Sequence, residues 1–248
     1  MDRPAPARRR IVGGLITAPA WTGVALGALG AGCAGLPAVP APAGAEPLPQ
    51  PALRVGDRWR YRLTDLYTGA TVGEAQVDLV AAAPELRLRV DRGDGRPPLE
   101  ERYADAWTVV AETIYDAPLR FEAPMPVVPP GARAGLRSSS RTRYHSEYSS
   151  RALDWSQRLR VVGWERVEVP AGTFDALRIE RMIDFAHPDF FRFGAERVDV
   201  LWYAPQVGRW VLREWTGSYM PGSPVPQRGR AREERTRWSL VAWQPAGR

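Results

Sequence analysis

The chain has 248 residues and a single cysteine, which excludes an intramolecular disulfide. Hydrophobic residues make up 44% and charged residues 25%, as in an ordinary globular protein, and the ten tryptophans favour β-structure. The formal net charge of +6 comes from arginine with no lysine, and no nucleic-acid-binding motif accompanies it, so we expect no nucleic-acid partner.

The amino terminus has the pattern of an export signal. Three arginines at residues 8–10 precede an uncharged apolar stretch over residues 11–29, and small residues lead directly to Cys33. This arrangement resembles a bacterial lipoprotein signal, in which the cysteine receives a diacylglycerol and the new amino terminus is acylated. It departs from that pattern at Gly30, where leucine is usual. An ordinary cleaved signal and an uncleaved membrane anchor are the alternatives.

These features predict three parts of the chain. Residues 1–32 are the signal peptide, residues 33–52 are a disordered Pro- and Ala-rich tether, and residues 53–246 form one β domain. Lipidation of Cys33, with acyl chains such as palmitate, would attach the domain to a membrane. The resemblance further implies that Ala34 directs the protein to the outer membrane, where it would face the periplasm.

Beyond residue 53 the pattern is that of successive short strands. Apolar residues alternate strictly with arginine over residues 58–63, and further strands are predicted over 71–81, 85–91 and, in one or two pieces, 99–112. The Pro-rich stretch 123–135 predicts a long loop. Residues 138–150 predict an exposed strand or a mobile loop.

Alternation resumes over residues 153–162, and two hairpins and a long last strand follow. Residues 167–181, VEVPAGTFDALRIER, predict two strands joined by a turn at Pro170 and Gly172. A second hairpin turns at residues 204–208, and the closing strand covers 230–243. Because no segment has a helical stripe, we predict an all-β, mainly antiparallel fold with little helix, as a single strongly curled sheet or half-barrel.

Three motifs in this region resemble those of the DUF3108 and TapB-like domains of bacterial envelope proteins. They are Gly-x-x-Trp-x-Tyr at residues 56–61, Val-Pro-Ala-Gly-Thr-Phe at 169–174 and Trp-Tyr-Ala-Pro-x-Val-Gly at 202–208. The resemblance covers residues 53–216 and implies a curled half-barrel similar to that of periplasmic lipoprotein-carrier proteins. It implies no catalytic residues.

No group of residues in the sequence indicates catalysis. His145 and His187 are the only histidines and lack ligand-spaced partners, so we expect no metal site and no cofactor. The chain has no Gly-x-Ser-x-Gly elbow and no phosphate-binding Gly-rich loop before a helix. We therefore predict a non-enzymatic protein, with a cell-wall or lipid hydrolase as the remote alternative.

Aromatic residues are the better candidates for a binding site. Six of them are predicted to face the inside of the curled sheet: Trp59, Tyr61, Trp155, Trp202, Trp210 and Trp238. They would bind an apolar or amphiphilic ligand such as a lipid, or an envelope partner, unless they only fill the core. The alternative is a structural or assembly component that docks to a larger envelope complex through a sheet edge or an Arg-rich face.

Overall fold

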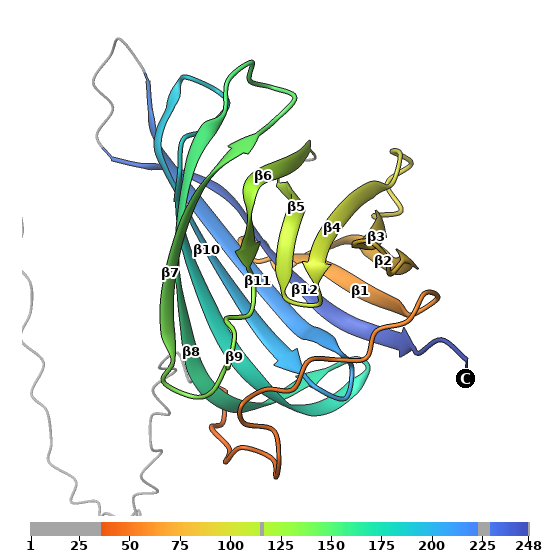
Figure 1. Ribbon diagram of the computed structural model, residues 1–248. Coiled ribbons are helices and arrows are strands. Elements are labelled where there is room, and N and C mark those ends of the chain that lie inside the picture. The colour runs from red at the N-terminus through yellow and green to blue at the C-terminus, as the bar shows by residue number, and fades with distance from the viewer. Residues whose placement is uncertain (1–35, 115–116, 223–228, 248) are drawn as a thin grey trace, which may run out of the picture. The chain divides into compact units, whose positions relative to one another are not determined.

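The computed structural model describes residues 36–114, 117–222 and 229–247, and in these it shows twelve antiparallel strands in a closed barrel (Figure 1). The strands are β1 (Arg58–Asp65), β2 (Thr71–Ala81), β3 (Leu86–Asp91), β4 (Leu99–Asp105), β5 (Thr108–Ile114), β6 (Ala117–Pro126), β7 (Arg137–His145), β8 (Leu153–Val169), β9 (Gly172–Phe185), β10 (Arg192–Ala204), β11 (Arg209–Pro221) and β12 (Ala231–Gln244). They follow chain order around the ring, and β1 closes it by pairing with both β2 and β12. The predicted all-β antiparallel class is confirmed, and the sheet curls until its ends meet.

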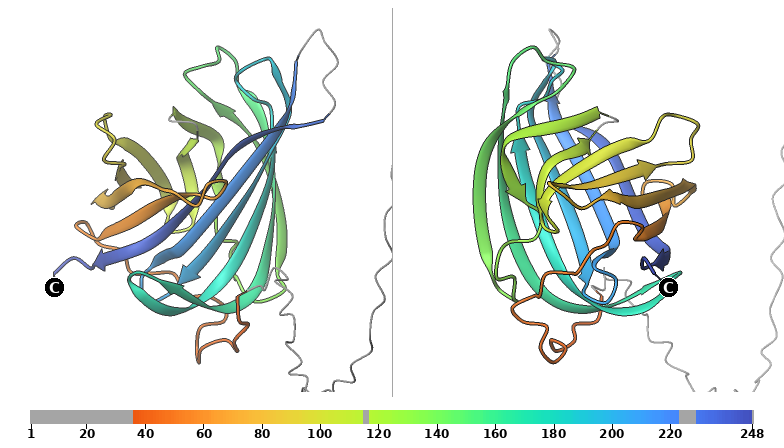
Figure 2. Two further views of the ribbon diagram at one scale, coloured as in Figure 1. Left: turned by 180° about the vertical axis from the view of Figure 1, so that it is seen from behind. Right: turned by 45° about the vertical axis from the view of Figure 1, so that its right-hand side comes forward.

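The two walls of the barrel differ in strand length. Strands β8 to β12 have 13 to 17 residues each, whereas β1 to β6 have 6 to 11. Seen from behind, β1 and β12 lie side by side where the ring closes (Figure 2). In β8 every second residue from Leu153 to Val161 is buried, and those between are exposed or half-buried. This is the period-2 pattern of a sheet with one face in the core.

The hairpin predicted over residues 167–181 is confirmed as the tip of the longest strand pair. Strands β8 and β9 pair from Trp155 to Val169, and the pairing shifts between Val161 and Gly163. Gly163 has φ of 153°, a conformation that glycine adopts without strain. This bulge moves the alternation by one residue, so that Trp164 as well as Val161 is buried.

Residues 33–52 were predicted to be a Pro- and Ala-rich tether, but in the described part of this range, residues 36–52, the segment is bonded to the barrel. The Pro37 carbonyl accepts a hydrogen bond from Arg166 N at 2.9 Å, and Val39 N donates to the Trp164 carbonyl at 3.0 Å. The segment thus pairs with β8 at Trp164 and Arg166. These backbone bonds are formed because an extended, Pro-rich chain still offers a carbonyl at every residue.

The same segment then contributes to the core. Leu48 is 4% exposed, and its amide donates to the Ala132 carbonyl at 2.8 Å. Glu46 accepts hydrogen bonds from Trp164 Nε1 at 2.8 Å and from Ala134 N at 3.0 Å. The compact unit therefore begins at Leu36 rather than at residue 53.

The predicted signal peptide over residues 1–32 and the predicted lipidation site Cys33 lie outside the described residues. Within the described ranges, no helix has the length and apolar character needed to cross a membrane. The stretch 138–150, left open between strand and loop, is a strand up to His145.

Candidate functional site

Charged side chains lie inside the barrel among the apolar core. Arg181 stands between Ile179 and Ile183 on β9, and Asp199 stands two residues before Leu201 on β10. All five residues are buried. Because side chains alternate along a strand, each charged residue shares the inward face with its apolar neighbours.

One buried and one half-buried arginine are neutralised by buried carboxylates. Arg181 donates to Glu112 through Nη1 at 3.2 Å and Nη2 at 3.1 Å, and to Asp199 at 3.1 Å. Arg213 donates to both oxygens of Asp199 at 2.9 and 2.8 Å. Burial raises the pKa of Asp199, but Arg213 and Arg181 outweigh burial and lower that pKa to about 2. This salt-bridge network joins β5, β9, β10 and β11 across the interior.

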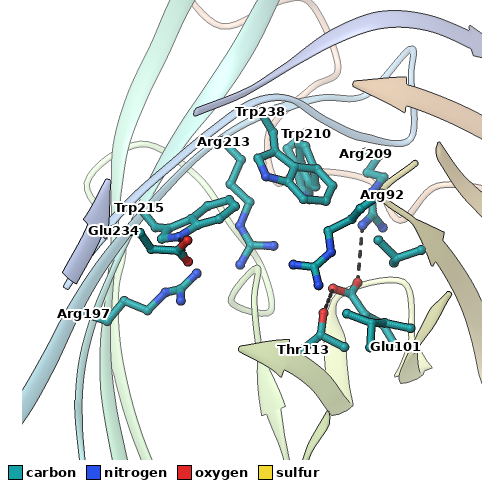
Figure 3. Close-up of a pocket in the computed structure, with 12 residues that line it drawn as sticks. Arg92, Glu101, Thr113, Arg197, Arg209, Trp210, Arg213, Trp215, Glu234 and Trp238 are labelled. Atoms are coloured by element: carbon teal, nitrogen blue, oxygen red, sulfur yellow. Dashed lines mark hydrogen bonds and ion pairs between the residues drawn. The ribbon is translucent and has the colours of Figure 1, made fainter. Parts of the chain in front are cut away.

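Beside the network lies a cavity of about 50 Å³ (Figure 3). Four arginines, two carboxylates and three tryptophans line it: Arg92, Arg197, Arg209, Arg213, Glu101, Glu234, Trp210, Trp215 and Trp238. Its volume is enough for a few water molecules. It is far below the roughly 300–1,000 Å³ of pockets that enclose drug-sized ligands. We call it the cationic cavity because guanidinium groups outnumber carboxylates on its walls.

Arg209 is a buried arginine of the cationic cavity with a long carboxylate contact. Its residue is 9% exposed, and its Nη2 reaches Glu101 Oε2 only at 3.5 Å. The buried Nε of Arg209 has no hydrogen-bond partner. Burial lowers the pKa of Arg209, but the oxygens of Tyr61, Tyr103 and Glu101 outweigh burial and raise it, so the guanidinium stays charged.

Glu101 is shared among several donors, which explains its weak contact with Arg209. It accepts hydrogen bonds from Tyr103 Oη at 3.1 Å and from Thr113 Oγ1 at 3.4 Å. Figure 3 shows Thr113 and Arg209 approaching Glu101 from different sides. Arg209 therefore retains hydrogen-bonding capacity that its protein neighbours do not use.

Two of the six aromatic residues predicted to form a site, Trp210 and Trp238, line this cavity, and Tyr61 and Trp59 lie next to lining residues. The rings of Tyr61 and Trp210 are 4.1 Å apart, and those of Trp210 and Trp238 are 5.8 Å apart. The Arg209 guanidinium lies 5.6 Å from the Trp59 ring and 4.9 Å from the Trp210 ring. These distances suit cation–π contacts, so the aromatic wall stabilises positive charge.

The other two predicted residues lie elsewhere. Trp155 is 1% exposed and packs against Phe121 at 5.1 Å between ring centroids. Trp202 donates through Nε1 to Glu165 at 2.6 Å and lies 5.5 Å from the Arg178 guanidinium. Both are buried and neither lines the cationic cavity.

Sequence reasoning missed the charged residues that line this interior. A detectable signal was present, because Arg181, Arg197 and Asp199 occupy positions of the apolar register in otherwise alternating strands. A charged residue in that register marks either a bulge or a buried ion pair. Which carboxylate meets which arginine depends on strands far apart in the chain, and spacing along one strand does not reveal it.

Two wider and more open hollows occur in the described part of the chain. One, of about 380 Å³, lies between residues 51–54, the turn 205–208 and residues 243–246. The other, of about 560 Å³, is bordered by residues 141–142, 154–156, 184–186 and 194–196. In the described ranges no three His, Cys, Asp or Glu side chains are grouped as metal ligands would be.

Comparison with known proteins adds two solved structures. A candidate lipoprotein of Parabacteroides distasonis ATCC 8503 is 12% identical, with a TM-score of 0.47, over 80% of this chain and 98% of its own. A candidate exported protein of Bacteroides fragilis NCTC 9343, described as having a YmcC-like fold, is 13% identical, with a TM-score of 0.48, over 77% of this chain and 97% of its own. No family model and no curated protein matches this chain, so the resemblance to DUF3108 domains stays a prediction.

Proposed function

We propose that this chain is a lipid-anchored, non-enzymatic envelope protein whose barrel binds a small anion in the cationic cavity. The observation that carries the proposal is Arg209, a buried and charged guanidinium whose Nε has no partner and whose nearest carboxylate contact is 3.5 Å long. A buried charge is costly unless it is paired and hydrogen-bonded. A bound anion would supply both.

The chemistry of the walls defines the class of anion. Guanidinium groups bind planar carboxylates and tetrahedral oxyanions through paired N–H donors. The volume of about 50 Å³ restricts the ligand to a small one. Formate, phosphate and sulfate fit this description, and the indole rings of Trp210 and Trp238 would exclude water around the pair.

This ligand differs from the apolar one expected from the sequence. The aromatic residues that were to hold an acyl chain are themselves packed, with Trp59, Tyr61 and Trp210 no more than 5% exposed. An acyl chain would also have to displace charged groups from their partners. The described interior therefore suits a small polar ligand better than a lipid.

Anchoring is the second part of the proposal and is supported by the signal-like sequence. Cys33 would carry the lipid, and Ala34 would favour the outer membrane with the barrel in the periplasm. Only Ala34 and Gly35 separate Cys33 from Leu36, the first residue of the compact unit. Three residues reach at most about 10 Å. The membrane would thus hold the barrel directly, without a long tether.

Anion binding is tested by thermal unfolding of the full-length protein in detergent. At constant ionic strength, replacing chloride by phosphate, sulfate or formate should raise the unfolding temperature for at least one anion, since a ligand that binds only the folded state stabilises it. Arg209→Gln should abolish that increase. Arg62→Gln, which removes an exposed arginine from β1, is the matched control and should leave the increase unchanged.

Two outcomes would overturn the anion site. One is an equal response to all anions, which would reflect general salt effects on the surface. The other is an increase that persists in Arg209→Gln, which would place any binding elsewhere.

A further inference from the structure

The barrel has one weak seam, between β6 and β7. These strands share only two residue pairs in the described structure, Arg120 with His145 and Phe121 with Tyr144. Figure 1 shows the two strands running apart from there. Over the described residues 137–143, β7 has ladder partners on β8 alone. On its other side this stretch has no ladder partner among the described residues, and β6 reaches it at Thr142 through the Ala123 amide.

Prolines explain why β6 does not cover this edge. Pro124 and Pro126 lie in the part of β6 beyond the two pairs, and proline has no amide hydrogen for a ladder. Beyond the two pairs, the Ala123 amide donates to the Thr142 hydroxyl at 3.0 Å. The Pro126 carbonyl accepts from the Gln157 side chain at 2.6 Å. Side chains thus replace strand pairing at the seam.

The orientation of the free backbone groups follows from the β8 ladder. Val161 N donates to the Leu136 carbonyl at 2.8 Å. Antiparallel bonds recur at every second residue, so Ser138, Ser140 and Thr142 turn their amides and carbonyls toward β8. The alternate residues turn theirs toward the open side: Arg137, Ser139, Arg141 and Arg143.

The side chains of these alternate residues are exposed and mostly cationic. Arg137 stands directly opposite Arg160 of β8, a like-charge pair that destabilises a sheet. Arg160 is paired with Glu180 at 3.8 Å and Arg143 with Asp154 at 3.9 Å. In the described structure Arg137 and Arg141 have no carboxylate partner, so the edge has an excess of positive charge.

We propose that the β7 edge binds an extended acidic segment of a partner protein by strand addition. Backbone bonds to Arg137, Ser139 and Arg141 would hold the strand, and its alternate carboxylates would lie opposite the arginines. Two features of the edge point to this partner: its unpaired backbone and its uncompensated charge.

The probe is a capped heptapeptide of alternating glutamate and valine, used with the full-length protein in detergent. It should bind in fluorescence anisotropy, bind better than the same peptide with lysine for glutamate, and slow hydrogen exchange at the amides of residues 137–143. N-methylation of alternate peptide bonds should abolish binding, because it removes ladder donors. Arg137→Glu/Arg141→Glu should weaken binding roughly tenfold, since two attractive cross-strand pairs become repulsive.

A second variant tests the backbone of the edge without changing its charge. Ser139→Pro removes an outward amide without removing a bond to β8, so it should fold and lose exchange protection. The matched control is Arg60→Glu/Arg62→Glu on β1, a strand that is paired on both sides. This variant should bind the peptide as the unaltered protein does. Any of four outcomes would overturn the proposal. These are equal binding of the lysine peptide, binding without protection of residues 137–143, an equal loss of binding in the β1 control, and no binding at all. In the last case the arginines only protect an edge against aggregation.

Discussion

At the residue scale, the buried salt-bridge network is the most sensitive part of the molecule. Asp199 is fully buried and accepts hydrogen bonds from two arginines. Removing one partner of such a group leaves the others charged and uncompensated, which typically costs about 3–5 kcal/mol. A well-packed apolar core of similar volume would stabilise the fold as much as this network does. We therefore expect the network mainly to specify which strands face each other.

We predict a distinctive pH dependence from Asp199. Its pKa in the folded protein is lowered from 3.8 to about 2, so its ionised form favours folding. That contribution is present in full above the ordinary pKa and is lost as pH falls toward 2. Asp199→Asn should therefore be less stable at neutral pH and should lose less free energy of unfolding between pH 4 and pH 2, as measured by urea denaturation.

Asp154→Asn provides the control for that series, because the Asp154 side chain is 91% exposed and lies 3.9 Å from Arg143. It should reproduce the pH profile of the unaltered protein. Parallel profiles for Asp199→Asn and the unaltered protein would show that Asp199 does not have the lowered pKa.

At the element scale, the segment 36–52 is part of the folded domain. Its backbone bonds to residues 164–166 and the buried Leu48 give it stabilising contacts that a free linker lacks. The Pro-rich composition did not reveal these contacts. Composition shows that the segment cannot form a core of its own, but it does not show whether the rest of the domain offers a surface for the segment. Trp164 supplies part of that surface through its buried indole N–H.

We predict that Glu46→Ala destabilises the protein by about 1–2 kcal/mol, because the indole N–H of buried Trp164 loses its acceptor. Urea denaturation would measure the loss, and limited proteolysis should cut residues 36–52 more readily. Glu168→Ala, which removes an exposed carboxylate at the end of β8, should change neither. An unchanged unfolding free energy in Glu46→Ala would mean that the segment contributes little to stability.

At the scale of the whole molecule, the proposed anchor and the barrel act together. If Cys33 is lipidated, only Ala34 and Gly35 separate the lipid-bearing residue from Leu36 in the chain. A single acyl chain binds a protein to a membrane only marginally, whereas several chains anchor the protein stably. The open edge of β7 would then be presented by an immobilised domain.

We predict that Cys33→Ala moves the protein from the membrane fraction to the soluble periplasmic fraction, because the acyl chains are lost. Fractionation followed by immunoblotting measures this. Cys33→Ala and Glu46→Ala should behave differently, since the second variant keeps the lipid. A Cys33→Ala protein that stays in the membrane fraction would contradict lipidation as the means of attachment.

The class of fold and most of the strands could be predicted from local patterns in the chain. Alternation over residues 58–63, 71–81 and 153–162 predicted β1, β2 and the first half of β8, because a sheet with one face in the core imposes a period of two on its residues. The turn residues Pro170 and Gly172 located the hairpin between β8 and β9. These features depend on residues that are neighbours in the chain, so they can be recognised in the sequence.

The contents of the barrel interior could not be predicted from local patterns in the chain. The predicted aromatic residues Tyr61 and Trp210 do meet inside the barrel, where Arg209, the neighbour of Trp210 in the chain, also meets Glu101 from the distant strand β4. Closure of the ring, the docking of residues 36–52 and the open edge of β7 likewise depend on long-range pairing. Such pairing is fixed by the packing of the whole barrel, and no local pattern in the chain encodes it.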